Sequence, residues 1–193
     1  MAYRRGFKKH ANDIAAEIRT ELGLGRLDRL DPLRLAEHLA IPVIPLSQLR
    51  GEATEAVAYF LERDEASFSG VTVFRGTHRA IVHNDAHALG RRNSDIAHEL
   101  AHALLMHEPG PAFGDGGCRN WDGDAEGEAN FLGAALLVTE DAALHVIRHG
   151  IDIRDGATAL GVTPKLLTWR INITGARKRI ERSRNYWRQR AAS

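Results

Sequence analysis

The stretch Ile96-Ala97-His98-Glu99-Leu100-Ala101-His102-Ala103-Leu104-Leu105 decides how this chain is interpreted. It is strongly apolar and contains neither glycine nor proline. It therefore predicts a helix that begins at a capping Ser94 or Asp95 and runs to about His107. His98 and His102 are four residues apart, which places both imidazoles on one face of that helix. Two ring nitrogens can therefore reach one metal ion at ~2.0–2.1 Å.

Glu99 follows His98 directly and points one step round the helix. It cannot easily join the same coordination sphere, but it can reach a water molecule at the metal. This favours Glu99 as the catalytic acid and base, which takes a proton from the water and returns it to a leaving amine. Zinc is the expected cofactor, and Mn²⁺ or Fe²⁺ could also occupy a site of two histidines and a glutamate. The pattern should arise by chance about 0.03 times in such a chain.

A catalytic zinc requires a third protein ligand, and two kinds of candidate follow the helix. His107 and Glu108 lie nine and ten residues beyond His98. Enzymes that take a third histidine downstream place a glycine-bearing turn before it, whereas Leu104-Leu105 continue the helix here. This spacing disfavours both residues as ligands.

Glu126 and Glu128 are the better candidates, on a helix predicted to begin at Asp122 or Asp124 and to run through Val138. Glu126 shares a face with Asn130, four residues later, and small residues beside that face would let two helices come close. Glu128 points roughly the other way. We prefer Glu126 as the third ligand on this argument, with Glu128 as the alternative.

Two other features near these glutamates have simpler interpretations. The run Asp122-Gly123-Asp124-Ala125-Glu126-Gly127 resembles the start of a calcium loop, but Gly133 stands where such a loop requires a glutamate. Cys118 is the one cysteine, so no internal disulfide can form, and we interpret it as a free thiol.

The remaining patterns predict an α+β fold that is mostly helical. A small antiparallel sheet should pack on the helix of the two histidines, as a hairpin of residues 68–74 and 80–83 around Gly76. Asp31-Pro32 is a typical helix start, and residues 52–63 fit either a strand or a helix. Further helices are expected over residues 8–22, 33–39, 141–148 and 154–160, and from 164 into the tail. We expect a zincin-like domain with N-terminal helices over 1–150 and a helical, basic segment over 151–193.

The composition is that of a globular protein: 193 residues, 44% hydrophobic, 26% charged, net charge +1. Residues 175–193 hold seven basic residues and one acidic residue, whereas the rest of the chain has 19 basic and 24 acidic residues. The first ten residues are charged and no apolar stretch follows, so we expect neither a signal peptide nor a membrane span, and a cytoplasmic location.

Two segments together resemble the ImmA/IrrE family of zinc metallopeptidases: the run from Ser94 to His107, and Glu126-Gly127-Glu128-Ala129-Asn130-Phe131-Leu132-Gly133-Ala134-Ala135-Leu136-Leu137. The similarity extends from the first helices to about Arg177. It implies a gluzincin-like core in which His98, His102 and Glu126 hold the metal and Glu99 is the acid and base. It also implies a protein substrate, a helix-turn-helix repressor whose cleavage releases phage, mobile-element or stress-response genes. Gly133, in place of a more usual alanine, departs from the family pattern.

The alternatives concern the tail and the role of the metal. The run Leu160-Gly161-Val162-Thr163-Pro164-Lys165 has the rhythm of a helix-turn-helix, which could bind DNA, although packing or docking is favoured. The competing function is a non-proteolytic regulatory or toxin–antitoxin-type module that keeps the zinc site as a scaffold. His83 and Tyr59 are candidates for the group that stabilises an oxyanion.

Overall fold

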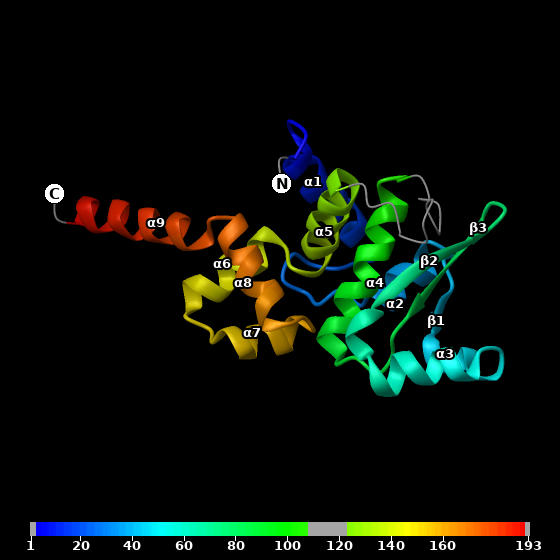
Figure 1. The fold of residues 1–193 in the computed structure, drawn as a ribbon. Coiled ribbons are helices and arrows are strands. Elements are labelled where there is room, and N and C mark those ends of the chain that lie inside the picture. Colours follow the sequence, from blue (N-terminus) through cyan, green and yellow to red (C-terminus); the bar gives the residue numbers. More distant parts are fainter. Residues whose placement is uncertain (1–2, 108–122, 192–193) are drawn as a thin grey trace.

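The structure, a computed structural model, describes residues 3–107 and 123–191. It is mostly helical with a small sheet, as the sequence predicts. Two helices precede the first strand, four short helical segments and a hairpin follow it, and a run of helices completes the described chain (Figure 1). The elements are α1 (Phe7–Glu21), α2 (Pro32–His38), β1 (Val43–Pro45), α3 (Thr54–Ala58), β2 (Gly70–Arg75), β3 (His78–His83), α4 (Leu89–Leu104), α5 (Gly123–Leu137), α6 (Glu140–His149), α7 (Ile153–Leu160), α8 (Pro164–Ile173) and α9 (Ala176–Ala191).

The sheet is mixed, whereas the sequence predicts an antiparallel one. The hairpin of β2 and β3 is antiparallel and turns at Gly76, as expected, with Val73 opposite Ala80. β1 adds on the other side of β3 in parallel, with Ile44 opposite Val82, so the strand order is β1-β3-β2. A strand of three residues that ends in a proline carries no alternating pattern, which is why its pairing could not be predicted.

The ambiguous stretch 52–63 is helical. α3 covers Thr54–Ala58, and a wider turn continues it over Tyr59–Arg63. It covers the face of the sheet opposite α4 through a small apolar cluster that contains Val57 and Val82. Burial of one side of this short helix outweighs the strand-like alternation of its sequence.

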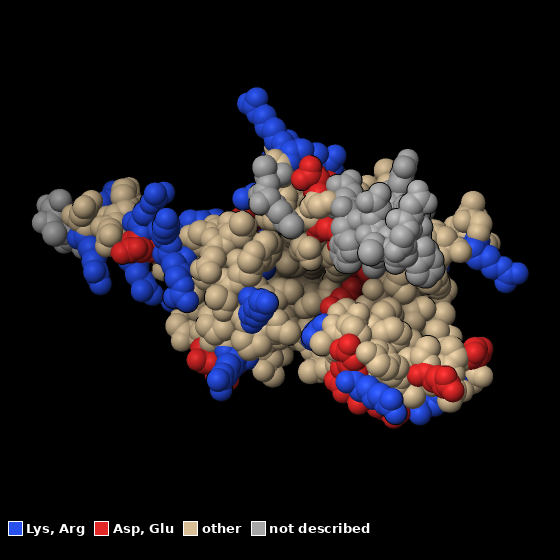
Figure 2. All heavy atoms as spheres, viewed as in Figure 1, with Lys and Arg blue, Asp and Glu red and all other residues tan. Residues whose placement is uncertain are grey.

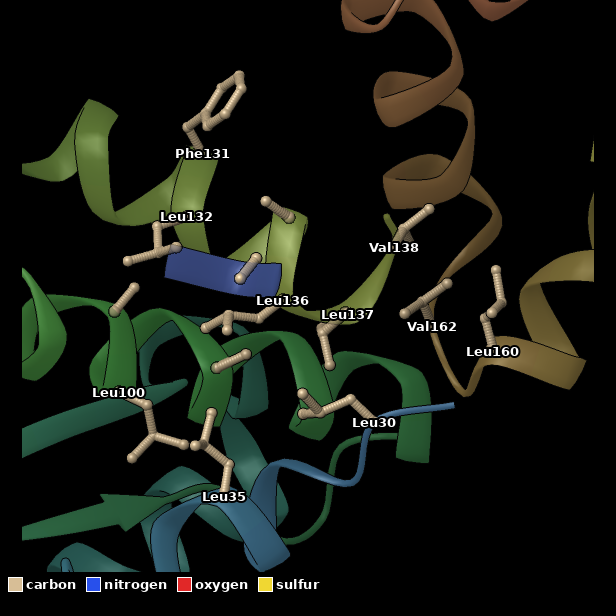
Figure 3. Close-up of a cluster of buried hydrophobic side chains, with 14 of the residues drawn as sticks. Leu30, Leu35, Leu100, Phe131, Leu132, Leu136, Leu137, Val138, Leu160 and Val162 are labelled. Carbon is tan, nitrogen blue, oxygen red and sulfur yellow. The ribbon is translucent and has the colours of Figure 1, made fainter. Parts of the chain in front are cut away.

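The main hydrophobic core lies between α1, α2, α4, α5 and the α7–α8 pair. Figure 3 shows Leu100 of α4 and Leu132 and Leu136 of α5 pointing into one cluster, with Val162 from the α7–α8 turn. α5 packs between α4 and α1, and most of its residues from Gly127 onward are buried. The helix of the third candidate ligand is therefore a central element of the core.

Two buried arginines bind the carboxyl end of α5. Arg19 Nη2 donates to the carbonyl of Leu136 at 3.0 Å, and Arg170 Nε donates to the carbonyl of Val138 at 2.9 Å. Both side chains are almost fully buried, and burial lowers the pKa of Arg170 to about 10. A positive charge at a helix C-terminus satisfies its free carbonyls and its dipole, so these contacts hold α5 in place.

The ends of α4 differ from the prediction. The helix begins at Leu89, not at Ser94 or Asp95, because Ser94 binds the carbonyl of Gly90 within the helix and Asp95 contacts His87. It ends at Leu104, where Met106 takes a left-handed conformation with φ 53°. The candidate cap Asp122 lies outside the described residues.

The C-terminal helices pack on the amino end of α4. Asn93 donates to the carbonyl of Gly161 at 2.7 Å, and a Cβ at Gly90 would lie 2.7 Å from the backbone of Val162. The α7–α8 turn is therefore buried against α4. The hydrophobic core contains residues on both sides of position 150, and the division into two parts at that point stays a prediction.

α9 projects from the body of the molecule. Residues 181–190 are all exposed, and Figure 2 shows Lys and Arg side chains gathered over this helix. Gly175, in a left-handed conformation with φ 65°, separates α9 from α8. Within residues 3–107 and 123–191, no single helix is both long and apolar enough to cross a membrane. α5 and α6 meet that measure only together, with a bend of 57°.

Candidate metal centre

Three side chains from α4 and α5 converge on one point. The Nε2 atoms of His98 and His102 are 3.1 Å apart. Glu126 Oε2 lies 3.2 Å from the first of these nitrogens, and Glu126 Oε1 lies 3.5 Å from the second. Each side chain is about one-fifth exposed, so the group faces solvent from the wall of a cleft. Among the described residues, this is the one group of three or more His, Cys, Asp and Glu side chains arranged to hold a metal ion.

The spacing of these atoms fits a tetrahedral ion. Bonds of ~2.0–2.1 Å at a tetrahedral angle separate neighbouring donors by about 3.3 Å. The two Nε2 atoms are 3.1 Å apart, and each lies near a different oxygen of Glu126, Oε2 at 3.2 Å from His98 and Oε1 at 3.5 Å from His102. Two imidazole nitrogens and one carboxylate oxygen form a donor set that zinc accepts while keeping a position for water.

The carboxylate of Glu126 and the ring of His98 stabilise each other's charged forms. Burial acts to raise the pKa of Glu126, but hydrogen bonds from His102 and His98, together with their charges, lower it to about 2. Burial acts to lower the pKa of His98, but the carboxylates of Glu126 and Glu99 outweigh it and raise that pKa. The carboxylate is therefore ionised, and so in a ligating state, at any physiological pH.

Glu99 lies beside the ligands but is held by a different element. Its side chain is buried, and the hydroxyl of Thr72 on β2 donates to Glu99 Oε2 at 2.5 Å. Glu99 therefore bridges from α4 to the sheet. Nothing in the sequence marks Thr72, because the contact joins residues of two elements that meet only in the folded chain.

The two histidines differ in the partner of Nδ1: among the described residues, Nδ1 of His98 has no hydrogen-bond partner. The side chain of Asn130 interacts with His98, and His107 Nδ1 lies 2.9 Å from His102 Nδ1. Glu128, the alternative third ligand, instead places Oε2 3.6 Å from His107 Nε2 and accepts from Arg4 Nε at 2.9 Å. The structure thus brings Glu126 to the two Nε2 atoms and Glu128 to an outer histidine.

The sequence matches the model of a known protein family. A model described as the IrrE N-terminal-like domain, Peptidase M78, matches residues 36–172, which include α4 and α5 with all three candidate ligands. The chain belongs to this family. A search of curated proteins finds no match. The M78 domain is metallopeptidase-like, and its His98–His102–Glu126 group is compatible with a metal site.

Gly133 sets the distance between the two helices that carry the M78 site. A Cβ added there would lie 3.0 Å from the carbonyl oxygen of Ala97 and 3.1 Å from the backbone nitrogen of His98. α5 therefore crosses α4 in near contact at the first histidine. The absence of a side chain at Gly133 lets the backbones of α5 and α4 approach this closely beside the candidate ligands.

A cleft of about 320 Å³ opens in front of the M78 site. Ser69 and Gly70 line it on the sheet side, Asn130 on α5, and Leu166 on α8, together with His98, Glu99 and Glu126. A larger depression of about 700 Å³ lies between the N-terminal segment and α8, and none of the candidate ligands lines it. The smaller one contains two of the candidate ligands, His98 and Glu126, together with Glu99.

Two predicted oxyanion stabilisers do not line this cleft. His83 is buried at the end of β3, where burial lowers its pKa, and Tyr59 is half exposed on the turn after α3. Asn130 does line the cleft. The sequence singled it out only as a residue on the same helix face as Glu126. Glu108 and Cys118 lie outside the described residues.

Proposed function

We propose that the protein is a zinc-dependent endopeptidase in which His98, His102 and Glu126 hold the ion and Glu99 is the acid and base. The observation that carries this proposal is the convergence of three side chains, whose closest nitrogen and oxygen atoms are 3.1–3.5 Å apart, beside a buried, anchored carboxylate. A structural zinc site is closed by four protein ligands, whereas three ligands beside a cleft are typical of a catalytic one.

The reaction assigns a task to each side chain. Zinc at this position supplies Lewis-acid chemistry, since it lowers the pKa of water and polarises a carbonyl group. Glu99 removes a proton from the attacking water and delivers it to the nitrogen of the leaving amine. The hydroxyl of Thr72 holds one oxygen of Glu99, which fixes the direction in which the carboxylate exchanges the proton.

The position of β2 supports a peptide as the substrate. Among the described residues β2 pairs only with β3, so its outer edge is free, and Ser69 and Gly70 at its start line the cleft. Free backbone groups on a strand edge can bind an extended peptide by adding it as a further strand. Gly70 carries no side chain, so a peptide backbone can approach Glu99 closely at that point.

We further propose, from the resemblance to the ImmA/IrrE family, that the substrate is a helix-turn-helix repressor. Purified protein with equimolar zinc is incubated with the repressor encoded nearest to it, and the products are identified by intact mass. One discrete cut is expected. Glu99→Gln keeps the size of the side chain and leaves the three ligands in place, so it should bind zinc and lose the cut. Undiminished cleavage by this variant contradicts the role of Glu99.

The same variant separates the enzyme from a regulatory binding module. An enzyme loses its cellular effect when Glu99 is changed to Gln. A module that uses the zinc site as a scaffold keeps that effect, because the ligands and the fold are unchanged. Derepression of the repressor's target gene, compared in cells that carry either form, gives the measurement.

A further inference from the structure

A chain of polar contacts leads from the metal ligand His102 to the N-terminal segment. His102 Nδ1 lies 2.9 Å from His107 Nδ1, and His107 Nε2 lies 3.6 Å from Glu128 Oε2. Glu128 Oε1 accepts from Arg4 Nε at 2.9 Å. His107 and Glu128 are only about one-seventh exposed, whereas Arg4 is mostly exposed. The contacts therefore connect the centre to the surface through two shielded groups.

The backbone after α4 builds the first of these contacts. The N–H of His107 donates to the carbonyl of His102 at 3.0 Å, and that of Met106 donates to the carbonyl of Ala103 at 3.1 Å. This is a Schellman turn, which requires a left-handed residue, and Met106 supplies it with φ 53°. The conformation is unfavourable for a residue other than glycine, so the surrounding contacts must hold it. The turn places the ring of His107 over that of His102, with centroids 5.0 Å apart.

If Nε2 of His102 held a metal, the protons in this series of contacts would have defined positions. With Nε2 as the ligand atom, the remaining proton of His102 is on Nδ1, which must donate to His107 Nδ1. His107 then carries its own proton on Nε2, facing the carboxylate of Glu128. Arg4 donates to the other oxygen of that carboxylate. Each donor in this series of contacts would then face an acceptor.

We propose that His107 is a positioning residue for the metal, which, supported by Glu128 and Arg4, fixes the ring of His102 and strengthens it as a ligand. The inference rests on the metal-binding part of the proposed function. An acceptor on the far nitrogen of a ligating imidazole orients the ring and increases its basicity, and loss of such a partner typically weakens metal binding 10- to 100-fold. His107 is thus part of the centre although it does not touch the ion.

The test measures zinc affinity by competition with a chelator for the full chain and four variants. His107→Ala removes the acceptor, and we expect affinity to fall by about 10- to 100-fold. His107→Asn places an amide oxygen near the position of Nδ1 and should recover part of the loss. Glu128→Gln removes the charge behind His107 and should weaken binding less than His107→Ala does. His10→Ala, at an exposed position on α1, is the matched control and should bind as the wild type does.

A second readout separates positioning from general damage to the fold. In the cobalt-loaded proteins, His107→Ala should shift the visible absorption bands, since these depend on ligand geometry, while the melting temperature of the metal-free protein stays near that of the control. If His107→Ala does not fold, Glu128→Gln, a substitution of equal size, decides by the same two measurements.

The outcomes distinguish this inference from the proposal on which it rests. Wild-type protein that binds no zinc refutes the proposed function and this inference together. Wild-type binding with unchanged affinity and unchanged cobalt bands in His107→Ala refutes the inference alone. Loss of all zinc binding in Glu128→Gln would show that Glu128 is itself a ligand and would also overturn the inference.

Discussion

The pKa values of Glu126 and His98 are shifted in opposite directions, and this determines when the site can accept a metal. The pKa of Glu126 is about 2, so its carboxylate is available across the physiological range. The pKa of His98 is raised by Glu126 and Glu99 against the effect of burial, so this ring takes up a proton more readily than an ordinary histidine. The histidine, not the carboxylate, therefore limits metal binding as the pH falls.

We expect the apparent zinc affinity to decrease as pH is lowered, beginning above the ordinary histidine pKa of about 6.5. A proton and the ion compete for the same lone pair, so protonation favours the metal-free form and a rise in pH restores binding. Chelator competition between about pH 5.5 and 8 measures this dependence. A constant affinity over that interval would contradict the assignment of His98 as a ligand.

Thr72→Val tests the anchoring of Glu99. The change keeps the shape of the side chain on β2 and removes the hydroxyl that donates to Glu99 Oε2. Loss of one hydrogen bond to a charged group costs about 1.5–3 kcal/mol. We expect the cleavage rate to fall by roughly 10- to 150-fold, with zinc affinity unchanged. Thr72→Ser keeps the hydroxyl and should retain most activity, and equal rates in all three proteins would exclude a role for Thr72.

At the level of single residues, the spacing in the sequence predicts only part of the candidate site. The four-residue interval puts His98 and His102 side by side, and the face shared with Asn130 favours Glu126. The partners behind them could not be predicted in this way. Thr72 reaches Glu99 across a strand–helix contact, and His107 reaches His102 through a turn that a continuous helix would not form.

The contact between α4 and α5 depends on the absence of a side chain at Gly133. A methyl group there meets the backbone of Ala97 and His98 at 3.0–3.1 Å, so Gly133→Ala must move one helix. Overpacking of this kind costs about 1–3 kcal/mol, and the shift separates Glu126 from the histidines. We expect lower stability to urea and weaker zinc binding.

Gly123→Ala is the matched control for that experiment. It makes the same substitution on the same helix, but among the described residues no atom outside its own helix turn lies within 4 Å of the added Cβ. Its zinc affinity should equal that of the wild type. Equal affinity in Gly133→Ala as well would mean that the crossing of the two helices tolerates a methyl group.

At the scale of elements, long periodic segments were predictable and their ends were not. Asp31 caps α2 by accepting from the N–H of Leu33, as the Asp31-Pro32 pair predicts. Asp95 has the same chemistry but lies inside α4, because contacts with His87 and Arg91 use its carboxylate instead. β1 was missed as a strand of the sheet because its partner β3 is distant in sequence.

The whole molecule divides its charge between a body and a projecting basic helix. Residues 181–190 of α9 are exposed, so a chain that ends after Ile180 should keep the melting temperature and zinc affinity of the full chain. Binding of both proteins to a DNA duplex at several salt concentrations shows whether the removed residues contact phosphates. A large loss of stability on truncation would contradict the exposed position of this helix.

Because its ligands come from two helices, an ion at this centre would also act as a reversible cross-link in the core. Closing a loop of chain with such a link opposes unfolding, and binding to the folded form alone adds about 2.7 kcal/mol when free zinc is 100 times its dissociation constant. Removal of zinc by a chelator should therefore lower the melting temperature, and added zinc should restore it. The amount of intact protein in a cell would then follow the supply of the metal.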